Sequence, residues 1–275
     1  CVNSNEVKLD NMFLVDNLTY NMRTTSSSGS CIGVALTNSY LAGTATVGMY
    51  IVGASSGIYV SNTSFQLNTS YGVQTVANAD GSPNACLFTQ CVFDTNLGAA
   101  QVQLTDGLLM EFNNCWWSGA TDGLHIETAV ADVRVIGGEI FNVGGHGIKN
   151  AATRVQIVGT SFRGCGYSST NTYDGIRLNG STQTIISGAS FYGAKDGVDV
   201  TRYGISIQNG AGTNNTNITG CVFGNMATGD YINEAGGPLN NVFLVQSNLY
   251  TASIANGATS TVYTFDATKV GTYLF

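Results

Sequence analysis

The stretch Val155-Gln-Ile-Val-Gly-Thr-Ser-Phe162 decides the fold, because its pattern returns along the chain. Apolar and polar residues alternate, a Gly or Asn follows, and an aromatic residue closes the unit. Close copies span residues 87–93, 184–191 and 217–223, and looser copies end at Tyr20, Phe65, Trp117, Phe141 and Tyr250. From Phe65 onward the closing aromatics are 28, 24, 24, 21, 29, 32 and 27 residues apart. Repeats of about 20 to 50 residues are typical of solenoids.

A second strand-like piece accompanies these units. It reads Gly-apolar-x-apolar, as in Asp122-Gly-Leu-His-Ile, Asp174-Gly-Ile-Arg-Leu and Asp196-Gly-Val-Asp-Val. Both pieces alternate with period two, which is typical of half-buried strands. The fixed place of the aromatic favours stacked turns over a sandwich or barrel, because stacking puts like residues in ladders. The sequence predicts an all-β chain, a parallel β-helix or β-solenoid of about 9–10 turns.

The pattern also divides the chain. We expect the solenoid to cover residues 1–250, with irregular N-terminal turns over 1–64. After Tyr250 the repeat is lost, and residues 251–275 read as two further strands, a cap or the start of a truncated β-sandwich. The chain begins with Cys rather than Met, so we interpret it as a processed or excised segment.

Composition limits the partners. Only 10% of the 275 residues are charged, against about 25% in ordinary globular chains. Asn, Thr and Ser take their place, and such a surface suits neutral partners such as sugars. The net charge of -7 gives no basic footprint for nucleic acid. No apolar run reaches the roughly 18 residues of a membrane span, so no membrane insertion is expected.

The seven cysteines indicate neither a complete disulfide framework nor a metal site. No Cys-x-x-Cys or Cys/His pair is present. Cys91, Cys115 and Cys221 each lie two residues before a closing aromatic, which predicts buried thiols that act as small apolar side chains. The sequence predicts no metal and no cofactor.

The repeat units with their Asp-Gly pieces resemble the right-handed, single-stranded parallel β-helix of the pectin-lyase-like superfamily, over about residues 45–250. The low-charge, Asn/Thr/Gly-rich composition resembles bacteriophage tailspike and tail-fibre β-helices. That resemblance implies a homotrimer on the virion tail, or outside the cell, with other virion tail proteins as partners. It also implies a host cell-surface polysaccharide as ligand.

Parity predicts which side chains face outward. If Leu124 and Ile126 point inward, His125 and Glu127 point outward. Successive turns lie about 4.8 Å apart, so the same parity predicts an outward ladder. Its members are Gln74, Gln103, His125, Lys149, Arg177 and Asp199. The ladder is either a polar strip for a glycan with acidic sugars or an ordinary solvated face with an Arg177–Asp199 ion pair.

Several carboxylates are candidates for catalysis. Asp before Gly is common turn chemistry. Alternatively, Asp174 and Asp196 on adjacent turns would be about 5 Å apart, the spacing of a retaining glycosidase. Asp122 and Asp174, two turns apart, would be on the order of 10 Å apart, near the upper end for inversion. The candidate catalytic residues are Asp122, Glu127, Asp174, Asp196 and Asp199.

Other residues are candidates for ligand binding. Trp116 precedes a closing aromatic, so parity turns its indole outward, where it either stacks on a sugar ring or packs against a neighbouring chain or loop. Tyr173 and Tyr203 are weaker versions of the same idea. The candidate ligand-binding residues are Trp116, His125, Lys149, Tyr173, Arg177 and Tyr203.

A histidine flanked by glycines tests one enzymatic hypothesis. Gly145-His-Gly147 resembles part of the polygalacturonase pattern, but the chain has no Asp-Asp pair, so we interpret His146 as a bend residue. Three functions remain open. The chain is a glycan-binding tailspike, the same scaffold with hydrolase or lyase activity, or a non-catalytic structural or adhesin solenoid.

Overall fold

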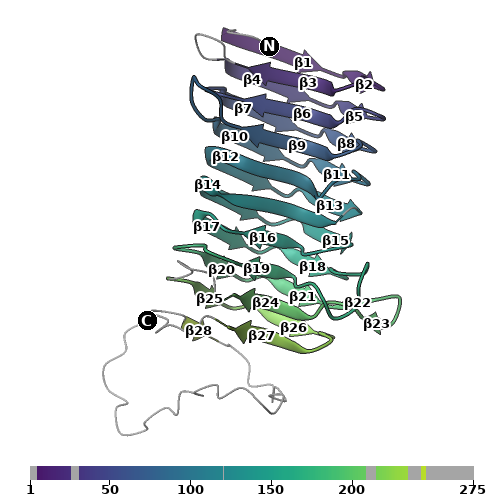
Figure 1. Cartoon of the computed structure of the whole chain (residues 1–275), viewed down its shortest axis with the longest axis vertical. Helices are drawn as coiled ribbons and strands as arrows, with labels where there is room; N and C mark the ends of the chain where they lie inside the picture. The colour runs from purple at the N-terminus through teal and green to yellow at the C-terminus, as the bar shows by residue number, and fades with distance from the viewer. Residues whose placement is uncertain (1–4, 26–30, 120, 209–214, 235–242, 246–275) are drawn as a thin grey trace, which may run out of the picture.

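Each turn of the chain gives one strand to each of three parallel β-ribbons, and the turns stack along the long axis of the molecule (Figure 1). The computed structural model describes residues 5–25, 31–119, 121–208, 215–234 and 243–245. The prediction of an all-β parallel β-helix is confirmed, and no described residue lies in a helix. The predicted strands within 251–275 lie outside the described residues.

The first ribbon carries the outward ladder. Its strands are β3 (Tyr20–Thr25), β6 (Val47–Val52), β9 (Tyr71–Val76), the first parts of β12 (Ala100–Asn113) and β14 (Asp122–Ile136), β16 (Ile148–Asn150), β19 (Ile176–Leu178), β24 (Tyr203–Ile207) and β27 (Gly229–Asn233).

The second ribbon continues from the first without a break in β12 and β14, so the two form one 17-stranded sheet. Its strands are β1 (Asn5–Asp10), β4 (Ile32–Thr37), β7 (Ser56–Ser61), β10 (Asn84–Thr89), the second parts of β12 and β14, β17 (Thr153–Val158), β20 (Ile185–Ser187), β25 (Asn217–Thr219) and β28 (Phe243–Val245).

The third ribbon is a separate 9-stranded sheet. Its strands are β2 (Phe13–Val15), β5 (Tyr40–Ala42), β8 (Ser64–Gln66), β11 (Val92–Asp94), β13 (Trp116–Gly119), β15 (Glu139–Val143), β18 (Ser161–Arg163), β21 (Ser190–Tyr192) and β26 (Val222–Gly224). A short antiparallel hairpin, β22 (Ala194–Lys195) and β23 (Val198–Asp199), follows β21.

The Gly or Asn of the repeat occupies the corner between the second and third ribbons. Its backbone φ is positive in turn after turn, a conformation that Gly and Asn adopt at low cost. The corner residues are Asn11, Asn38, Asn62, Asn114, Gly137, Gly159, Gly188 and Gly220, and Gln90 takes the same conformation in one turn. The sequence signal that identified the repeat is therefore a bend of fixed geometry.

Inward side chains of the third ribbon form the central column of the core. Register pairs align Leu14, Leu41, Phe65, Phe93, Trp117, Ile140, Phe162, Phe191 and Phe223. Rings stack face to face where the column is aromatic; the Phe162 and Phe191 centroids are 4.7 Å apart. Cys91 and Cys115 are buried free thiols beside it, and Cys221 is a half-buried one.

Two expected closing aromatics lie elsewhere. Counted from the corner residue Gly137, the inward position falls on Ile140, so Phe141 turns outward and its ring stacks on Trp116 with centroids 6.3 Å apart. Tyr20 belongs to the first ribbon, where it stacks on Tyr50. The aromatic spacing was therefore misread by one residue at β15.

Buried amides brace the corner between the third and first ribbons. Asn68 is fully buried, and its Nδ2 donates to Asn96 Oδ1 at 2.7 Å. Its Oδ1 accepts from Asn21 Nδ2 at 3.1 Å. Each amide thus forms a hydrogen bond with an amide of the adjacent turn, so these buried polar groups have the partners they need.

Replacement of Asn68 with Ala should destabilise the fold by about 1–3 kcal/mol, because it leaves buried partners on two turns unsatisfied. The measurement is the midpoint of urea unfolding followed by circular dichroism. Asn179→Ala is the control, since Asn179 is exposed and surface changes are usually within about 0.5 kcal/mol. Equal midpoints for the two variants would contradict the bracing role.

Candidate functional site

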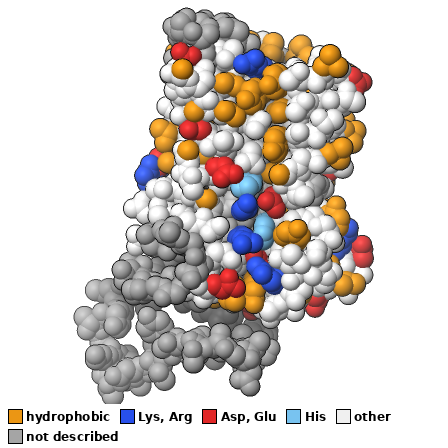
Figure 2. Space-filling model, viewed as in Figure 1, with side chains coloured by type: hydrophobic (Ala, Val, Ile, Leu, Met, Phe, Trp, Pro, Cys, Tyr) orange, Lys and Arg blue, Asp and Glu red, His pale blue; other side chains and the backbone are white. Residues whose placement is uncertain are grey.

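A strip of polar and charged side chains runs along the first ribbon. Register pairs join Gln74 to Gln103, Gln103 to His125, His125 to Lys149 and Lys149 to Arg177, so this part of the predicted ladder is confirmed. Figure 2 shows it as red, blue and pale blue side chains near the middle of the face, beside areas with few charges.

No helix in the described part of the chain could cross a membrane.

The last predicted member of the ladder is wrong. Arg177 pairs with Ser206 on the next turn, not with Asp199. Asp196-Gly197 forms the turn of the β22–β23 hairpin, with both φ angles positive, as a type I′ hairpin turn requires. Asp196 and Asp199 are exposed on this hairpin, which projects from the stack (Figure 1). The residue next to Asp174 on the following turn is Tyr203, so the predicted Asp174–Asp196 pair does not exist.

Glycines allow close stacking beside the strip. A Cβ on Gly123 would lie 2.6 Å from the Gly147 carbonyl oxygen, and one on Gly147 would lie 2.5 Å from that of Gly175. The residue before each of these glycines therefore has a fixed place at the corner. Those residues are Asp122, His146, Asp174 and, before Gly204, Tyr203. The corner set mixes acids with a histidine and a tyrosine.

Asp174 acts as a brace within the strip. It is fully buried, and Arg202 binds both of its oxygens, Nε to Oδ1 at 2.9 Å and Nη2 to Oδ2 at 2.8 Å. Ser206 Oγ donates to Oδ2 at 2.6 Å. The carboxylate hydrogen bond raises the pKa of Arg202 above its usual value. With its oxygens committed to these donors, the Asp174 carboxylate ties its own turn to the next and acts as a structural brace.

His146 lies next to Asp174, on the preceding turn. Its Nδ1 accepts the backbone N–H of Asp174 at 3.0 Å, and its own backbone N–H donates to Asp122 Oδ1 at 2.8 Å. The edge of its ring contacts Tyr173, with centroids 5.1 Å apart. Burial lowers the pKa of His146 to about 4, because the charged form loses its hydration. The imidazole is therefore neutral at neutral pH.

A second cluster joins two carboxyl groups through His125. Its Nε2 lies 3.1 Å from Glu127 Oε1, and its Nδ1 lies 4.0 Å from Asp122 Oδ2. Gln103 also donates to Glu127 Oε1, at 3.2 Å. Burial raises the pKa of Asp122 to about 6, and the backbone N–H of His146 and the charge of Lys149 offset part of that rise. Burial, then Lys149, lowers the pKa of His125. A carboxyl group that titrates near neutrality, in a cluster with a histidine and a second carboxyl group, is suited to acid–base chemistry.

The Asp122→Asn variant should be more stable than the wild type at pH 7.5 and similar to it at pH 4. Because its folded pKa is raised from 3.8 to about 6, Asp122 favours folding below pH 3.8, and this contribution is lost as the pH rises to about 6. Asn mimics the neutral acid and keeps an acceptor for His146. The expected gain at pH 7.5 is on the order of 1–3 kcal/mol.

Thermal unfolding midpoints at the two pH values check this. The contribution of His146, which falls as the pH drops from 6.5 toward 4, is common to both proteins and cancels in the difference. A variant that gains stability only at pH 4, or equally at both values, would contradict the burial cost assigned to Asp122.

The structure brings together most of the predicted ligand-binding residues. His125, Lys149 and Arg177 lie in register, and Tyr173 contacts His146. The Arg202 guanidinium lies over the Tyr203 ring, with its Cζ 5.2 Å from the ring centroid. Trp116 is half-buried on β13 in the third ribbon, outside the strip.

Sequence reasoning missed three members of the site. His146 was read as a bend, and Arg202 and Gln208 were not considered. The signal for His146 was its place before a Gly-apolar-x-apolar piece, the same place that Asp122 and Asp174 hold. No comparable signal marks Arg202 or Gln208, because their long side chains reach the site from neighbouring turns.

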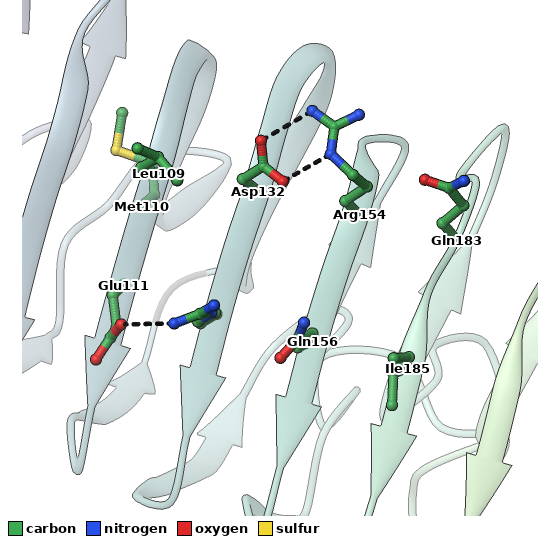
Figure 3. A pocket seen from close by; sticks show the side chains of 9 residues that line it. Leu109, Met110, Glu111, Asp132, Arg154, Gln156, Gln183 and Ile185 are labelled. Atoms are coloured by element: carbon green, nitrogen blue, oxygen red, sulfur yellow. Dashed lines mark hydrogen bonds and ion pairs between the residues drawn. The ribbon is translucent and has the colours of Figure 1, made fainter.

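A second polar surface lies on the second ribbon. It is a shallow groove of about 310 Å³, crossed by ion pairs between turns (Figure 3). Arg154 binds both oxygens of Asp132, at 2.6 and 2.8 Å, and Arg134 lies 3.8 Å from Glu111. These ion pairs are well exposed, so variants of them are matched controls for variants of the strip. The described residues contain no group of His, Cys, Asp and Glu side chains that could hold a metal.

Two solved structures share this fold. The enzymatically active domain of tailspike protein 2 of bacteriophage CBA120 is 12% identical, with a TM-score of 0.53, over 79% of this chain and 42% of that one. The receptor-binding domain of the siphovirus 9NA tailspike is 9% identical, with a TM-score of 0.55, over 90% of this chain and 49% of that one. The chain thus spans less than half the length of either neighbour. No protein-family model and no curated protein matches the sequence. The chain has the parallel β-helix fold of phage tailspikes.

Proposed function

We propose that this chain is the β-helical part of a phage tailspike on the virion tail and that it binds a host cell-surface polysaccharide. The observation that carries the proposal is the strip on the first ribbon. In a chain with only 10% charged residues, the strip gathers two histidines, Lys149, Arg177 and buried carboxylates on one face. A linear face with many hydrogen-bonding groups fits an extended sugar chain.

Tyrosines flank the charges. Tyr173 and Tyr203 are half-buried beside His146 and Arg202, so their rings are partly open to a ligand. Aromatic rings that combine an apolar face with a polar tip suit sugar binding. The tailspike fold of the two structural neighbours supports the same assignment.

Binding to a panel of purified bacterial capsular and O-antigen polysaccharides, measured by biolayer interferometry, tests this proposal. We expect one or more polysaccharides to bind the wild type and to bind the Arg177→Gln variant more weakly. Arg154→Gln is the control, because Arg154 lies in the groove of the second ribbon. Equal losses in both variants, or no binding by a folded protein across the panel, would count against it.

A second candidate function is depolymerisation by a hydrolase or lyase. It is favoured by Asp122, whose pKa is raised to about 6 by burial, in a cluster where His125 also contacts Glu127. Of the five carboxylates suggested by sequence, these two remain the candidates. The assay is release of reducing ends or unsaturated products from a bound polysaccharide. Binding without any product would contradict the depolymerase function. It would favour a protein that recognises the polysaccharide, or has a structural or adhesin role, without catalysing its cleavage.

We also propose that the chain assembles as a homotrimer that joins other virion tail proteins. Large apolar side chains are exposed along the second ribbon, and contact with other chains would cover them. They are Ile32, Tyr59, Leu108, Leu109, Val158 and Ile185. Light scattering coupled to size-exclusion chromatography should give three times the chain mass of 28.7 kDa. A monomer at micromolar concentration would contradict this assembly.

A further inference from the structure

His146 and Arg177 meet with donor groups facing each other. Because His146 Nδ1 accepts the backbone N–H of Asp174 at 3.0 Å, the proton of the neutral ring is on Nε2. Arg177 Nη1 lies 3.3 Å from that Nε2, and a guanidinium can only donate. Both groups therefore direct N–H bonds at each other, and neither can accept from the other.

No rearrangement of the imidazole removes this conflict. Protonation of the ring would make both nitrogens donors and would break the bond from the Asp174 N–H. A flipped ring would place carbon against that N–H and leave a buried backbone donor unpaired, which costs free energy. The acceptor that both donors need must come from a third group.

The described residues do not supply that acceptor. Arg202 holds both oxygens of Asp174. Glu127 is bound by His125 and Gln103. Asp122 Oδ1 accepts the backbone N–H of His146. Burial raises the pKa of Asp122 and the charges of Lys149 and Arg177 offset part of that rise, but in the described residues neither cation donates a hydrogen bond to it.

Positive charge gathers at the same place. Lys149 is the register partner of Arg177 and lies close enough to His146 to disfavour its protonation. In the described part of the chain, no hydrogen bond or ion pair reaches the Lys149 ammonium. Arg177 has one acceptor, Gln208 Oε1, which Nη2 reaches at 3.2 Å. Two cations and an imidazole N–H thus lie together, and no described carboxylate accepts a hydrogen bond from any of the three.

We propose that His146, Lys149 and Arg177 form a cradle for the carboxylate of an acidic sugar residue. The two oxygens of a carboxylate can accept from Arg177 Nη1 and His146 Nε2 together, while Lys149 contributes its charge. This inference rests on the proposed function, since the bound polysaccharide would supply the acidic sugar. Phosphate and sulfate substituents also carry anionic oxygens, so inorganic phosphate and sulfate are compared with a carboxylate as probes.

The two histidines make the cradle directly observable. In protein labelled with ¹⁵N-histidine, only His125 and His146 give imidazole signals, and a His125→Gln variant assigns them. The probes are sodium D-glucuronate, its neutral methyl ester, sodium phosphate and sodium sulfate, at constant ionic strength. We expect glucuronate to shift the His146 signals saturably and the methyl ester to leave them unshifted.

Variants assign the effect to the cradle. Arg177→Gln should weaken glucuronate binding at least about tenfold, because it removes a charge-assisted hydrogen bond. Lys149→Gln should weaken it about two- to fivefold, and this side chain has no partner whose loss would disturb folding. Arg154→Gln, on the second ribbon, should have no effect. Circular dichroism and unfolding midpoints confirm that each variant is folded.

Three results would overturn the cradle: no saturable shift with glucuronate, an equal shift with the methyl ester, or binding of phosphate or sulfate at least as tight as that of glucuronate. Failure of the proposed function looks different. If a polysaccharide binds the strip equally well before and after its carboxyl groups are reduced to alcohols, recognition stands and the cradle fails. If glucuronate shifts His146 but no polysaccharide binds, the cradle stands and the proposed function fails.

Discussion

The Asp174→Ala variant is expected to lose about 3–5 kcal/mol of stability, because it removes one partner of a buried ion pair. Asp174 is fully buried, and the Arg202 side chain is 25% exposed. Without the carboxylate, the Arg202 guanidinium and the Ser206 hydroxyl lose their acceptor in a place where water cannot fully replace it. Because Arg202 is partly exposed, we expect a value near the lower end of the range.

The second ribbon contains a matched control. Asp132 and Arg154 form the same two-bond pair between adjacent turns, at 2.6 and 2.8 Å, but their side chains are 33% and 50% exposed. Asp132→Ala should therefore cost only about 0–1 kcal/mol. Thermal and urea unfolding of the two variants give the comparison. Wild-type stability in Asp174→Ala, together with lost release of sugar products, would make Asp174 a catalytic residue instead of a brace.

The Phe93→Ala variant is expected to lose about 3–5 kcal/mol, because the ring leaves a cavity in the centre of the stack. Phe93 is fully buried. Its ring centroid lies 5.3 Å from that of Phe65 on one turn and 5.6 Å from that of Trp117 on the next. Its edge also meets Phe88 and Phe112. Aromatic pairs of this kind add about 0.5–1.5 kcal/mol each beyond buried area.

Phe13→Ala provides the comparison, since Phe13 is 71% exposed and stacks only on Tyr40 at one end of the molecule. Its change should be about 1 kcal/mol or less. The readout is the unfolding midpoint in urea, followed by near- and far-ultraviolet circular dichroism. Similar losses for Phe13 and Phe93 would contradict a fold held together by its central column.

The repeat could be predicted because it reflects local geometry. A corner residue with positive φ and an inward side chain three residues later recur in each turn, so Gly159 and Phe162 mark the unit directly. The same counting explains the error at Phe141, where a Gly-Gly pair obscured which residue begins the corner. Period-two parity then placed His125, Lys149 and Arg177 on one outward face.

The chemistry of the site was less accessible from sequence, because one dipeptide has two structural roles. Asp174-Gly175 lies at a corner of the stack, whereas Asp196-Gly197 closes a hairpin. Spacing does not separate them, because 29 residues lead from Asp174 to Tyr203 and 22 to Asp196, and a turn of 22 residues also joins Gln103 to His125. Hydrogen bonds between turns depend on where long side chains such as that of Arg202 extend. The sequence pattern alone does not determine which acceptor such a side chain contacts.

Hydrogen exchange measured by mass spectrometry, with and without a bound polysaccharide, tests the central claim most directly. The claim is that the strip on the first ribbon is the binding surface. We predict that exchange slows in peptides covering residues 146–150, 173–178 and 203–208, while the second-ribbon peptides 131–136 and 153–158 keep their rates. Slowed exchange confined to those second-ribbon peptides would contradict the claim and would place the ligand in the groove between Glu111 and Ile185.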